Sequence, residues 1–385
     1  MSKEKKVLFV HDFGFKISED SRLYTAVGLP EIYFDRFFDA GFNKVNILSR
    51  ASVQNSENIN ESGFVEIKNK NIQVIKGIKN NYLNLFNPFI LSDILKIVNS
   101  HDLIVISTPS IIGSYISILS ILTQNKYSVE VAADTDMFSS KKFGFIVTFF
   151  LKLFMPIFVK KALGATYVTN DLCKRFPNEI NNVSSNVNIQ TIKQKKVLTK
   201  KLIDKKLVQI GFVGGITKRK GVKIIVKAIK LLVENGYTNL QVNLIGGHSD
   251  ENWNEIIKSY KLEKYFNFIG IVTSIEVNNY LSEFDLYLQP SFSEGLPRAS
   301  LEAMSHGLPV IATKLPGFQE ILEDDFLIKT GDSEKLSELI MILFTNINIY
   351  NRESENNIEI SKTFQYSILH NKRVKFYKKM IHESN

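Results

Sequence analysis

The chain has 385 residues, enough for two domains of ordinary size. Apolar residues make up 44% of it and charged residues 23%, which excludes an intrinsically disordered chain. The formal net charge of +9 would suit an anionic membrane, a phosphorylated substrate or nucleic acid, although solvated lysines alone are the simpler explanation.

The chain contains a single cysteine, Cys173. This excludes an internal disulfide framework, and the Cys/His spacing of a zinc site is absent from the sequence. The apolar run at residues 7–10 follows the N-terminus directly and is too short for the core of a signal peptide. We therefore expect a cytoplasmic protein.

Apolar runs alternate with helical patterns along the first half of the chain. The runs predict buried strands at residues 7–10, 45–48, 103–106 and 127–131. The helical patterns lie at residues 31–40, 92–100 and 111–122. We interpret residues 12–29 as the loop of the first strand-to-helix turn. Short apolar strands that alternate with helices are typical of a parallel sheet with helices on both faces.

The second half repeats this alternation. Strands are predicted at residues 208–213, 241–245, 266–269, 286–288, 310–312 and 326–328, and helices at residues 222–235, 252–260, 275–283, 298–306 and 333–344. A segment rich in Asn, Lys, Ser and Gln, residues 181–206, separates the halves. The predicted fold class is α/β, with Rossmann-like domains at residues 1–190 and 191–362. A basic helix is predicted at residues 363–380, within a C-terminal segment of residues 363–385.

One apolar segment, from Phe143 to Val159, calls for comparison with a membrane helix. It is too short for a span of about 20 apolar residues, and Lys152 and Pro156 interrupt it. Its aromatic residues and flanking lysines suit a helix that lies on anionic lipid, so peripheral membrane contact is one interpretation. A core helix with lysines at its ends fits equally well.

The strongest functional signal is QPSFSEGLPRASLEAM at residues 289–304. It follows a predicted strand and opens a helix at about Arg298, whose free N–H groups and positive dipole end suit a phosphate. Glu294 lies beside Gly295, where backbone amides can approach a ligand closely. Glu302 lies about one turn into the helix, where its carboxylate can accept two hydrogen bonds from a ribose diol. The pattern predicts a site for a sugar, a diphosphate and a ribose.

In this context the Glu-x7-Glu motif resembles that of retaining glycosyltransferases of family 4, which have the GT-B fold. Other stretches resemble the family in the same order, at residues 208–221, 244–247, 268–270, 309–321 and 329–332. The resemblance covers essentially the whole second domain. It implies two Rossmann-like domains facing a cleft, with the C-terminal helix packing back on the first domain.

The resemblance also implies roles for individual residues. Glu302 would bind the ribose hydroxyls, Glu294 would contact the donor sugar, and Lys220 would contact the diphosphate. The other donor-binding candidates are Gly214, Gly215, Lys218, Arg219, Gly270, Ser293, Gly295 and Leu296.

One position departs from the family pattern. The family usually has Gly-Arg where this sequence has Gly214-Gly215, and that Arg binds phosphate. Lys218 or Arg219, in the same loop, are the candidates to replace its charge; otherwise donor affinity would be weaker or the protein inactive. A solvated basic turn is the alternative for this loop, although not for Lys220 alone.

The first domain resembles the family more loosely, at residues 129–138 and 164–169. Many relatives have a His after the corresponding strand, near the donor sugar. Asp134 is the nearest polar residue here, so it joins Glu294 and Lys220 as a catalytic candidate.

The acceptor-binding candidates are Gly28, Arg22 and Tyr24, and each is otherwise an ordinary loop residue. The Asp-x-Asp at residues 134–136 matches the metal-binding motif of GT-A transferases. We interpret it as a surface turn, and no metal or other cofactor is expected.

The resemblance implies transfer of a sugar from a nucleotide diphosphate-sugar to a saccharide or lipid-linked saccharide, with retention at the anomeric carbon. The expected pathway is bacterial capsule or lipopolysaccharide biosynthesis, at the inner face of the cytoplasmic membrane. A catalytically degenerate sugar-nucleotide-binding subunit and a GT-B nucleotide-sugar epimerase are the alternatives. No recognition motif supports a nucleic-acid partner.

Overall fold

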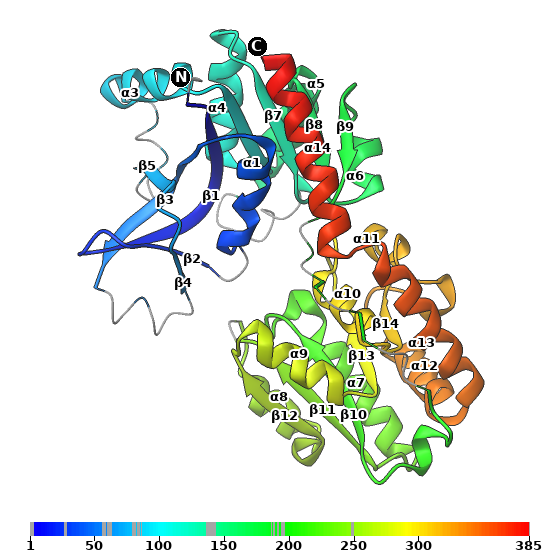
Figure 1. The fold of residues 1–385 in the computed structure, drawn as a ribbon. Helices are drawn as coiled ribbons and strands as arrows, with labels where there is room; N and C mark the ends of the chain where they lie inside the picture. Colours follow the sequence, from blue (N-terminus) through cyan, green and yellow to red (C-terminus); the bar gives the residue numbers. More distant parts are fainter. Residues whose placement is uncertain are drawn as a thin grey trace. The chain divides into compact units, whose positions relative to one another are not determined.

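The computed structural model describes residues 4–26, 29–55, 59, 64–78, 82, 85, 87–135, 144–185, 187, 189–190, 192–193, 197–247 and 250–384. The chain divides into two compact units (Figure 1). Unit 1 comprises Met1–Asn186 with Leu369–Asn385, and unit 2 comprises Val187–Ile368. The boundaries predicted after residues 190 and 362 lie a few residues from these.

Unit 1 contains a nine-stranded sheet in the described part of the chain. Its order is β4-β2-β1-β6-β7-β8-β9, and β3 pairs with β1 and β5. The strands are β1 (Lys6–Ser18), β2 (Leu23–Ala26), β3 (Lys44–Gln54), β4 (Phe64–Ile67), β5 (Ile72–Ile78), β6 (Leu103–Thr108), β7 (Tyr127–Val131), β8 (Gly164–Tyr167) and β9 (Asn181–Val183). All pairs are parallel except those of β2 with β1 and β4.

The prediction that residues 12–29 form a loop was wrong. Strand β1 continues past a register shift between Val10 and Gly14 and pairs with β3 as far as Ser18, and β2 then returns antiparallel to it. Phe15 is buried, and it alternates with Gly14 and Lys16 in the period of two that a strand requires. Gly and Lys in this run hid the alternation from the sequence pattern.

Helices cover both faces of the unit 1 sheet. They are α1 (Asp35–Ala40), α3 (Pro88–Asn99), α4 (Ile111–Leu122), α5 (Gly144–Lys161), α6 (Asn170–Arg175) and α14 (Tyr366–Ser384). Alternate strand residues feed two apolar clusters, as the period of two requires. One cluster contains Leu8 and side chains of α3, α4 and α5, and the other contains Val7 and side chains of α1 and α14.

A buried ion pair connects α1, β7 and α14. A guanidinium nitrogen of Arg36 lies 2.8 Å from the carboxylate of Glu130, and the hydroxyls of Tyr33 and Tyr377 donate to the same carboxylate. Arg36 and Glu130 are 1% and 6% exposed. Burial, with the nearby charge of Arg36, lowers the pKa of Arg373 on α14 to about 10. The last helix therefore docks on unit 1 through a polar contact as well as apolar ones.

Unit 2 contains a parallel sheet of order β12-β11-β10-β13-β14-β15. The strands are β10 (Val208–Val213), β11 (Leu240–Ile245), β12 (Phe266–Gly270), β13 (Leu286–Gln289), β14 (Val310–Thr313) and β15 (Leu327–Ile328). The helices are α7 (Val222–Glu234), α8 (Trp253–Ser259), α9 (Ser274–Glu283), α10 (Arg298–Ser305), α11 (Pro316–Gln319), α12 (Ser333–Thr345) and α13 (Ile347–Lys362), with a 3-10 turn, η5, at Lys218–Lys220. This is the strand order of the Rossmann fold, in which ligands bind at the carboxyl ends of the strands.

The α/β prediction is confirmed for both units, and the strands predicted in unit 2 match the observed ones closely. Helix α13 was not predicted, because polar and charged residues interrupt its apolar pattern. The predicted final helix at residues 363–380 corresponds to α14, which begins at Tyr366 and ends at Ser384.

Glu130→Gln should destabilise unit 1 by about 3–5 kcal/mol, because it leaves the Arg36 charge buried without its counter-ion. Urea unfolding, monitored by far-UV circular dichroism, measures the change in the free energy of unfolding. Glu4→Gln is the matched control, since the Glu4–Lys44 pair is solvent-exposed and should contribute less than about 1 kcal/mol. Equal losses of stability in the two variants would contradict the role of the buried Arg36–Glu130 ion pair.

Candidate functional site

Two loops meet at the carboxyl edge of the unit 2 sheet. The turn η5 follows β10, and the motif loop follows β13, its neighbour in the sheet. Gly221 has φ +75°, and a Cβ there would lie 1.8 Å from the carbonyl oxygen of Pro290. The amide of Phe292 donates to the carbonyl of Arg219 at 2.8 Å. Only glycine permits this close backbone contact, so Gly221 fixes the turn against the motif loop.

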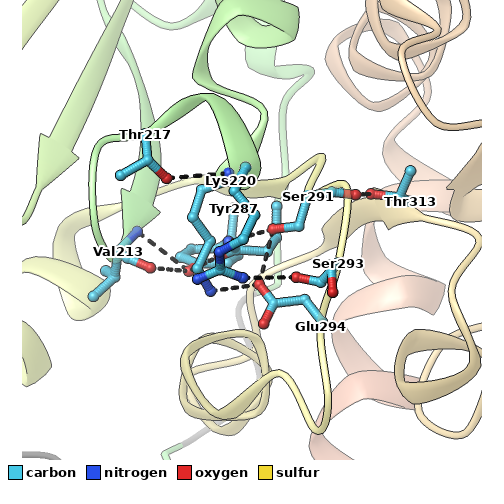
Figure 2. A network of polar contacts seen from close by, with 10 residues as sticks. Val213, Thr217, Lys220, Tyr287, Ser291, Ser293, Glu294 and Thr313 are labelled. Atoms are coloured by element: carbon cyan, nitrogen blue, oxygen red, sulfur yellow. Dashed lines mark hydrogen bonds and ion pairs between the residues drawn. The ribbon is translucent and has the colours of Figure 1, made fainter. Parts of the chain in front are cut away.

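The contact brings Lys220 and Glu294 together, as Figure 2 shows. The Lys220 ammonium lies 2.5 Å from a carboxylate oxygen of Glu294, and the two side chains are 18% and 10% exposed. The hydroxyl of Thr217 accepts the Lys220 amide at 3.3 Å and caps the turn. Two of the predicted site residues are therefore direct partners, although they lie far apart in the sequence.

A series of hydrogen-bonded polar side chains ends at the same oxygen of Glu294 that binds Lys220 (Figure 2). The Tyr287 hydroxyl donates to the Gln289 side chain at 2.7 Å, Gln289 donates to Ser291 at 3.1 Å, and Ser291 donates to Glu294 at 2.8 Å. Thr313 on β14 fixes the Ser291 carbonyl with a hydrogen bond of 2.5 Å. These partners of Glu294 were not predicted as site residues.

A pattern in the sequence could have indicated this series of hydrogen-bonded side chains. Positions 287 and 289 alternate along β13, so their side chains leave the strand on one side and can bond to each other, and Ser291 follows two residues later. Polar side chains at alternate positions of a buried parallel strand are unusual, because such strands are ordinarily apolar throughout.

Glu302 lies on α10, the helix that follows the motif loop. Burial raises the pKa of Glu302, and the charge of Arg298 opposes the shift. Burial also raises the pKa of Tyr287 well above its ordinary value, and the charges of Glu302 and Glu294 add to this, so both carboxylates lie near Tyr287. Glu302 is half-buried, and its carboxylate can accept hydrogen bonds from a ligand.

Close backbone contacts shape the rest of the site. A Cβ on Gly246 would lie 2.0 Å from the Gly214 carbonyl oxygen, and a Cβ on Gly317 would lie 1.8 Å from the Gly295 carbonyl oxygen. Helix α10 has no side-chain cap at Pro297, and its Arg298 amide donates to the Leu296 carbonyl at 3.0 Å, so the next amides of its first turn are the ones suited to another acceptor. Lys220 follows β10, and α10, which carries these amides and Glu302, follows the loop after β13. All of these groups therefore lie at the carboxyl edge of the sheet.

The basic residues of η5 divide between different partners. The Lys218 amide and ammonium are held by Asp250 and Glu251, and Lys218 is largely exposed. Arg219 donates to the carbonyl of Ser293 at 2.9 Å, so its guanidinium contacts the motif loop. Of the two candidates to replace the missing family Arg, Arg219 is therefore the better placed.

The other predicted donor residues lie at the same edge of the sheet. Gly215 and Leu296 lie in the two loops, and Gly270 ends β12 with φ +87°. A Cβ on Gly215 would meet only the Thr217 methyl, at 3.6 Å. Sterics therefore do not prevent a side chain at this position.

The site residues predicted in unit 1 do not come together in one cluster. Asp134 is the catalytic candidate among them, and it is held by an ion pair. Arg175 binds Asp134 at 2.6 Å, and although burial acts in the opposite direction, this hydrogen bond and charge lower the pKa of Asp134. A carboxylate held this way is poorly suited to accept a proton. Asp136, which completes the Asp-x-Asp motif, lies outside the described residues.

The acceptor candidates lie around the hairpin of β1 and β2. Arg22 pairs with Asp20 at 2.7 Å, and Tyr24 is only 3% exposed. Burial favours a packing role for Tyr24 over contact with an acceptor. Gly28 and Phe143 lie outside the described residues.

Comparison with known proteins bears on this site. Residues 193–360 match the family model described as "Glycosyl transferases group 1". Protein CapJ of Staphylococcus aureus is 29% identical over 345 residues, which cover 87% of this chain and 85% of CapJ. The capsular polysaccharide biosynthesis glycosyltransferase CapM of the same species is 28% identical over 134 residues, or 34% of this chain and 35% of CapM. These matches support a glycosyltransferase of bacterial surface-polysaccharide biosynthesis.

Solved structures show the fold of this chain. Sucrose-phosphate synthase from Thermosynechococcus elongatus superposes with a TM-score of 0.70 at 13% identity, covering 98% of this chain and 100% of that one. Anabaena Alr3699/HepE in complex with UDP superposes with a TM-score of 0.68 at 15% identity, covering 98% of each chain. The predicted GT-B fold, with its two Rossmann-like units, is confirmed.

Gly221→Ala should displace the turn η5 from Pro290 and separate Lys220 from Glu294. The substitution adds a backbone clash to a left-handed residue, so the free energy of unfolding should fall by more than the roughly 1–2 kcal/mol of the left-handed conformation alone. Urea unfolding of unit 2 measures it.

Gly236→Ala is the matched control, because Gly236 has φ +88° at the other end of α7 and nothing lies within 4 Å of its added Cβ. It should lose only the conformational contribution. An equal loss in both variants would show that the contact with Pro290 adds nothing.

Proposed function

We propose that the protein is a retaining, metal-independent glycosyltransferase of the family 4 type, which transfers a sugar from a nucleotide diphosphate-sugar to a saccharide or lipid-linked saccharide. The observation that carries the proposal is the convergence of Lys220, Glu294, Glu302 and the uncapped N-terminus of α10 at one sheet edge. One ammonium and the positive dipole end of a helix, both suited to a diphosphate, thus lie near two carboxylates suited to hydroxyls. A lipid-linked acceptor would place the protein at the inner face of the cytoplasmic membrane.

Each group has a defined task in this proposal. The Lys220 ammonium and the amides of α10 would stabilise the negative charge on the departing diphosphate. Glu302 would accept the two hydroxyl hydrogen bonds of the ribose. Glu294, held by Ser291 and Lys220, would orient the donor sugar. HepE binds UDP and UDP-glucose in its solved complexes, which supports a uridine nucleotide as the first donor to test.

The ion pair of Lys220 with Glu294 gives the same site a defined state before donor binding. Each charge compensates the other in a partly buried position. An incoming diphosphate would take over Lys220, and a sugar hydroxyl would take over part of Glu294. The two groups would therefore exchange partners without either charge being left unpaired.

Purified protein should show a thermal shift with one member of a panel of UDP-, GDP-, ADP- and CMP-sugars. Glu302→Ala should weaken that binding by about 1.5–3 kcal/mol, or roughly 10- to 150-fold in Kd, because hydrogen bonds to a charged acceptor are lost. Binding should weaken as the pH falls through the raised pKa of Glu302, since the protonated group no longer accepts at both oxygens. Glu302→Gln should remove this pH dependence.

Glu283→Ala is the matched control, because Glu283 is exposed at the end of α9. Absence of any donor shift would favour a degenerate scaffold protein that has lost donor binding. With donor and acceptor together, NMR of the product should show the anomeric configuration of the donor, and EDTA should leave the rate unchanged. Release of nucleotide diphosphate without acceptor would instead favour an epimerase.

Gly215→Arg should strengthen donor binding by about 1.5–3 kcal/mol, because it adds a guanidinium beside the diphosphate position where a side chain fits. Titration calorimetry with the donor identified above measures the change. Gly215→Gln is the matched control of similar reach without charge. Equal affinity in both variants would mean that Arg219 already supplies the charge.

A further inference from the structure

Helix α5 is apolar around its whole circumference. Its sequence, GFIVTFFLKLFMPIFVKK, has only Thr148 and three lysines as side chains that can hydrogen-bond. A helix of this kind is ordinarily buried on every side. Here one side packs into unit 1, with Leu151, Met155, Phe158 and Val159 each no more than 3% exposed.

The opposite side of α5 is exposed. Phe145 is 80% exposed, Phe149 64%, Leu153 55% and Ile157 47%, at intervals of four residues. Ile146, 63% exposed, lies beside them. We name these five side chains the α5 face. Because side chains four apart lie above one another, they form one continuous stripe along the helix. A stripe of large apolar side chains of this extent marks an interaction surface.

Helix α4 extends the apolar surface. It contacts α5, and Leu122 near its end is 73% exposed, with Ile118 and Ile121 partly exposed beside it. Both helices connect parallel strands of the same sheet, so they run in the same direction and their C-terminal ends lie at one edge. The exposed apolar groups therefore continue across two neighbouring helices.

The charges on α4 and α5 have one sign, because neither helix contains an acidic residue. Exposed Lys160 and Lys161 end α5, and Lys152 lies within it. Exposed Lys126 follows α4, and its ammonium donates one hydrogen bond, of 2.7 Å, to the backbone carbonyl of Glu383. The lysines at the two C-terminal ends lie at the same edge of the sheet and border the apolar groups with positive charge.

We propose that the α5 face docks on an anionic lipid bilayer, with its apolar side chains among the lipid chains and Lys126, Lys160 and Lys161 at the headgroup phosphates. Large apolar side chains with flanking lysines are the composition of helices that lie in a membrane interface. None of the described helices is long and apolar enough to cross a membrane. The helix accordingly lies along the surface.

A second copy of the chain fits this surface less well. A two-fold symmetric dimer through the α5 face would oppose identical surfaces, and each brings lysines without an acidic residue on either helix to pair with them. An anionic bilayer supplies both the apolar layer and the compensating charge. The inference deepens the proposed function, because it would bring unit 1 to a lipid-linked acceptor, but vesicle binding needs neither donor nor acceptor.

The full chain is mixed with vesicles of phosphatidylcholine alone or with phosphatidylglycerol, and bound protein is measured by co-sedimentation. We expect binding to the anionic vesicles only, weakened by salt. Lys160→Gln with Lys161→Gln should lower the partition coefficient roughly 25-fold, since each lysine near an anionic surface contributes about fivefold. Phe149→Glu with Leu153→Glu should lower it at least about tenfold.

The matched control is Lys378→Gln with Lys379→Gln. Both lysines are exposed on α14, which packs on the other face of the same sheet, so this variant should bind vesicles almost as the parent does apart from its lower net charge. Because Phe149 and Leu153 are exposed, their substitution should leave the thermal unfolding and the donor-induced thermal shift unchanged. A donor shift with no vesicle binding would overturn this inference and leave the proposed function standing.

Two further outcomes would overturn it. One is equal loss of binding in the α5 and α14 lysine variants, which would indicate a response to net charge alone. The other is a dimer, detected by analytical ultracentrifugation, that Phe149→Glu with Leu153→Glu converts to a monomer. That result would assign the face to a second copy of the chain.

Discussion

The ion pair between Lys220 and Glu294 determines how the candidate site is built. It joins a turn after β10 to a loop after β13, two segments that the parallel sheet places side by side. Both charges are largely withdrawn from water, so each needs the other while no ligand is present. Gly221 makes this pairing possible, because it lets the turn approach Pro290. A Cβ at this position would clash with the Pro290 carbonyl and force the turn that carries Lys220 away from the motif loop.

Side chains of strand β13 and of the loop after it also fix the position of the Glu294 carboxylate. Tyr287 and Gln289 of β13 and Ser291 just beyond it hydrogen-bond in series to Glu294, so the carboxylate is fixed from inside the domain as well as by Lys220. Glu302 has a different environment, because burial raises its pKa and the charge of Arg298 opposes that shift.

The sequence predicted the strands of unit 2 well, because short apolar runs bounded by turn glycines are local signals. It did not predict the hairpin of β1 and β2, where Gly14 and Lys16 interrupt the alternation that Phe15 shares. Nor could it assign partners. Lys218 and Arg219 are adjacent and equally basic, yet one pairs with Glu251 and the other donates to Ser293. That division depends on the path of the turn in space, which no local pattern encodes.

Helices α5 and α7 differ in how far the local sequence pattern predicts which side of the helix is buried. In α7 the apolar residues occupy one side and exposed lysines the other, so the sequence alone indicates which side is buried. In α5 both sides are apolar, and the sequence fits a core helix and an interfacial helix equally. Only the sheet decides between them, because unit 1 has no further layer over Phe145, Phe149 and Leu153 in its described residues. The proposed contact with an anionic bilayer would cover this apolar side and pair with the lysines that border it.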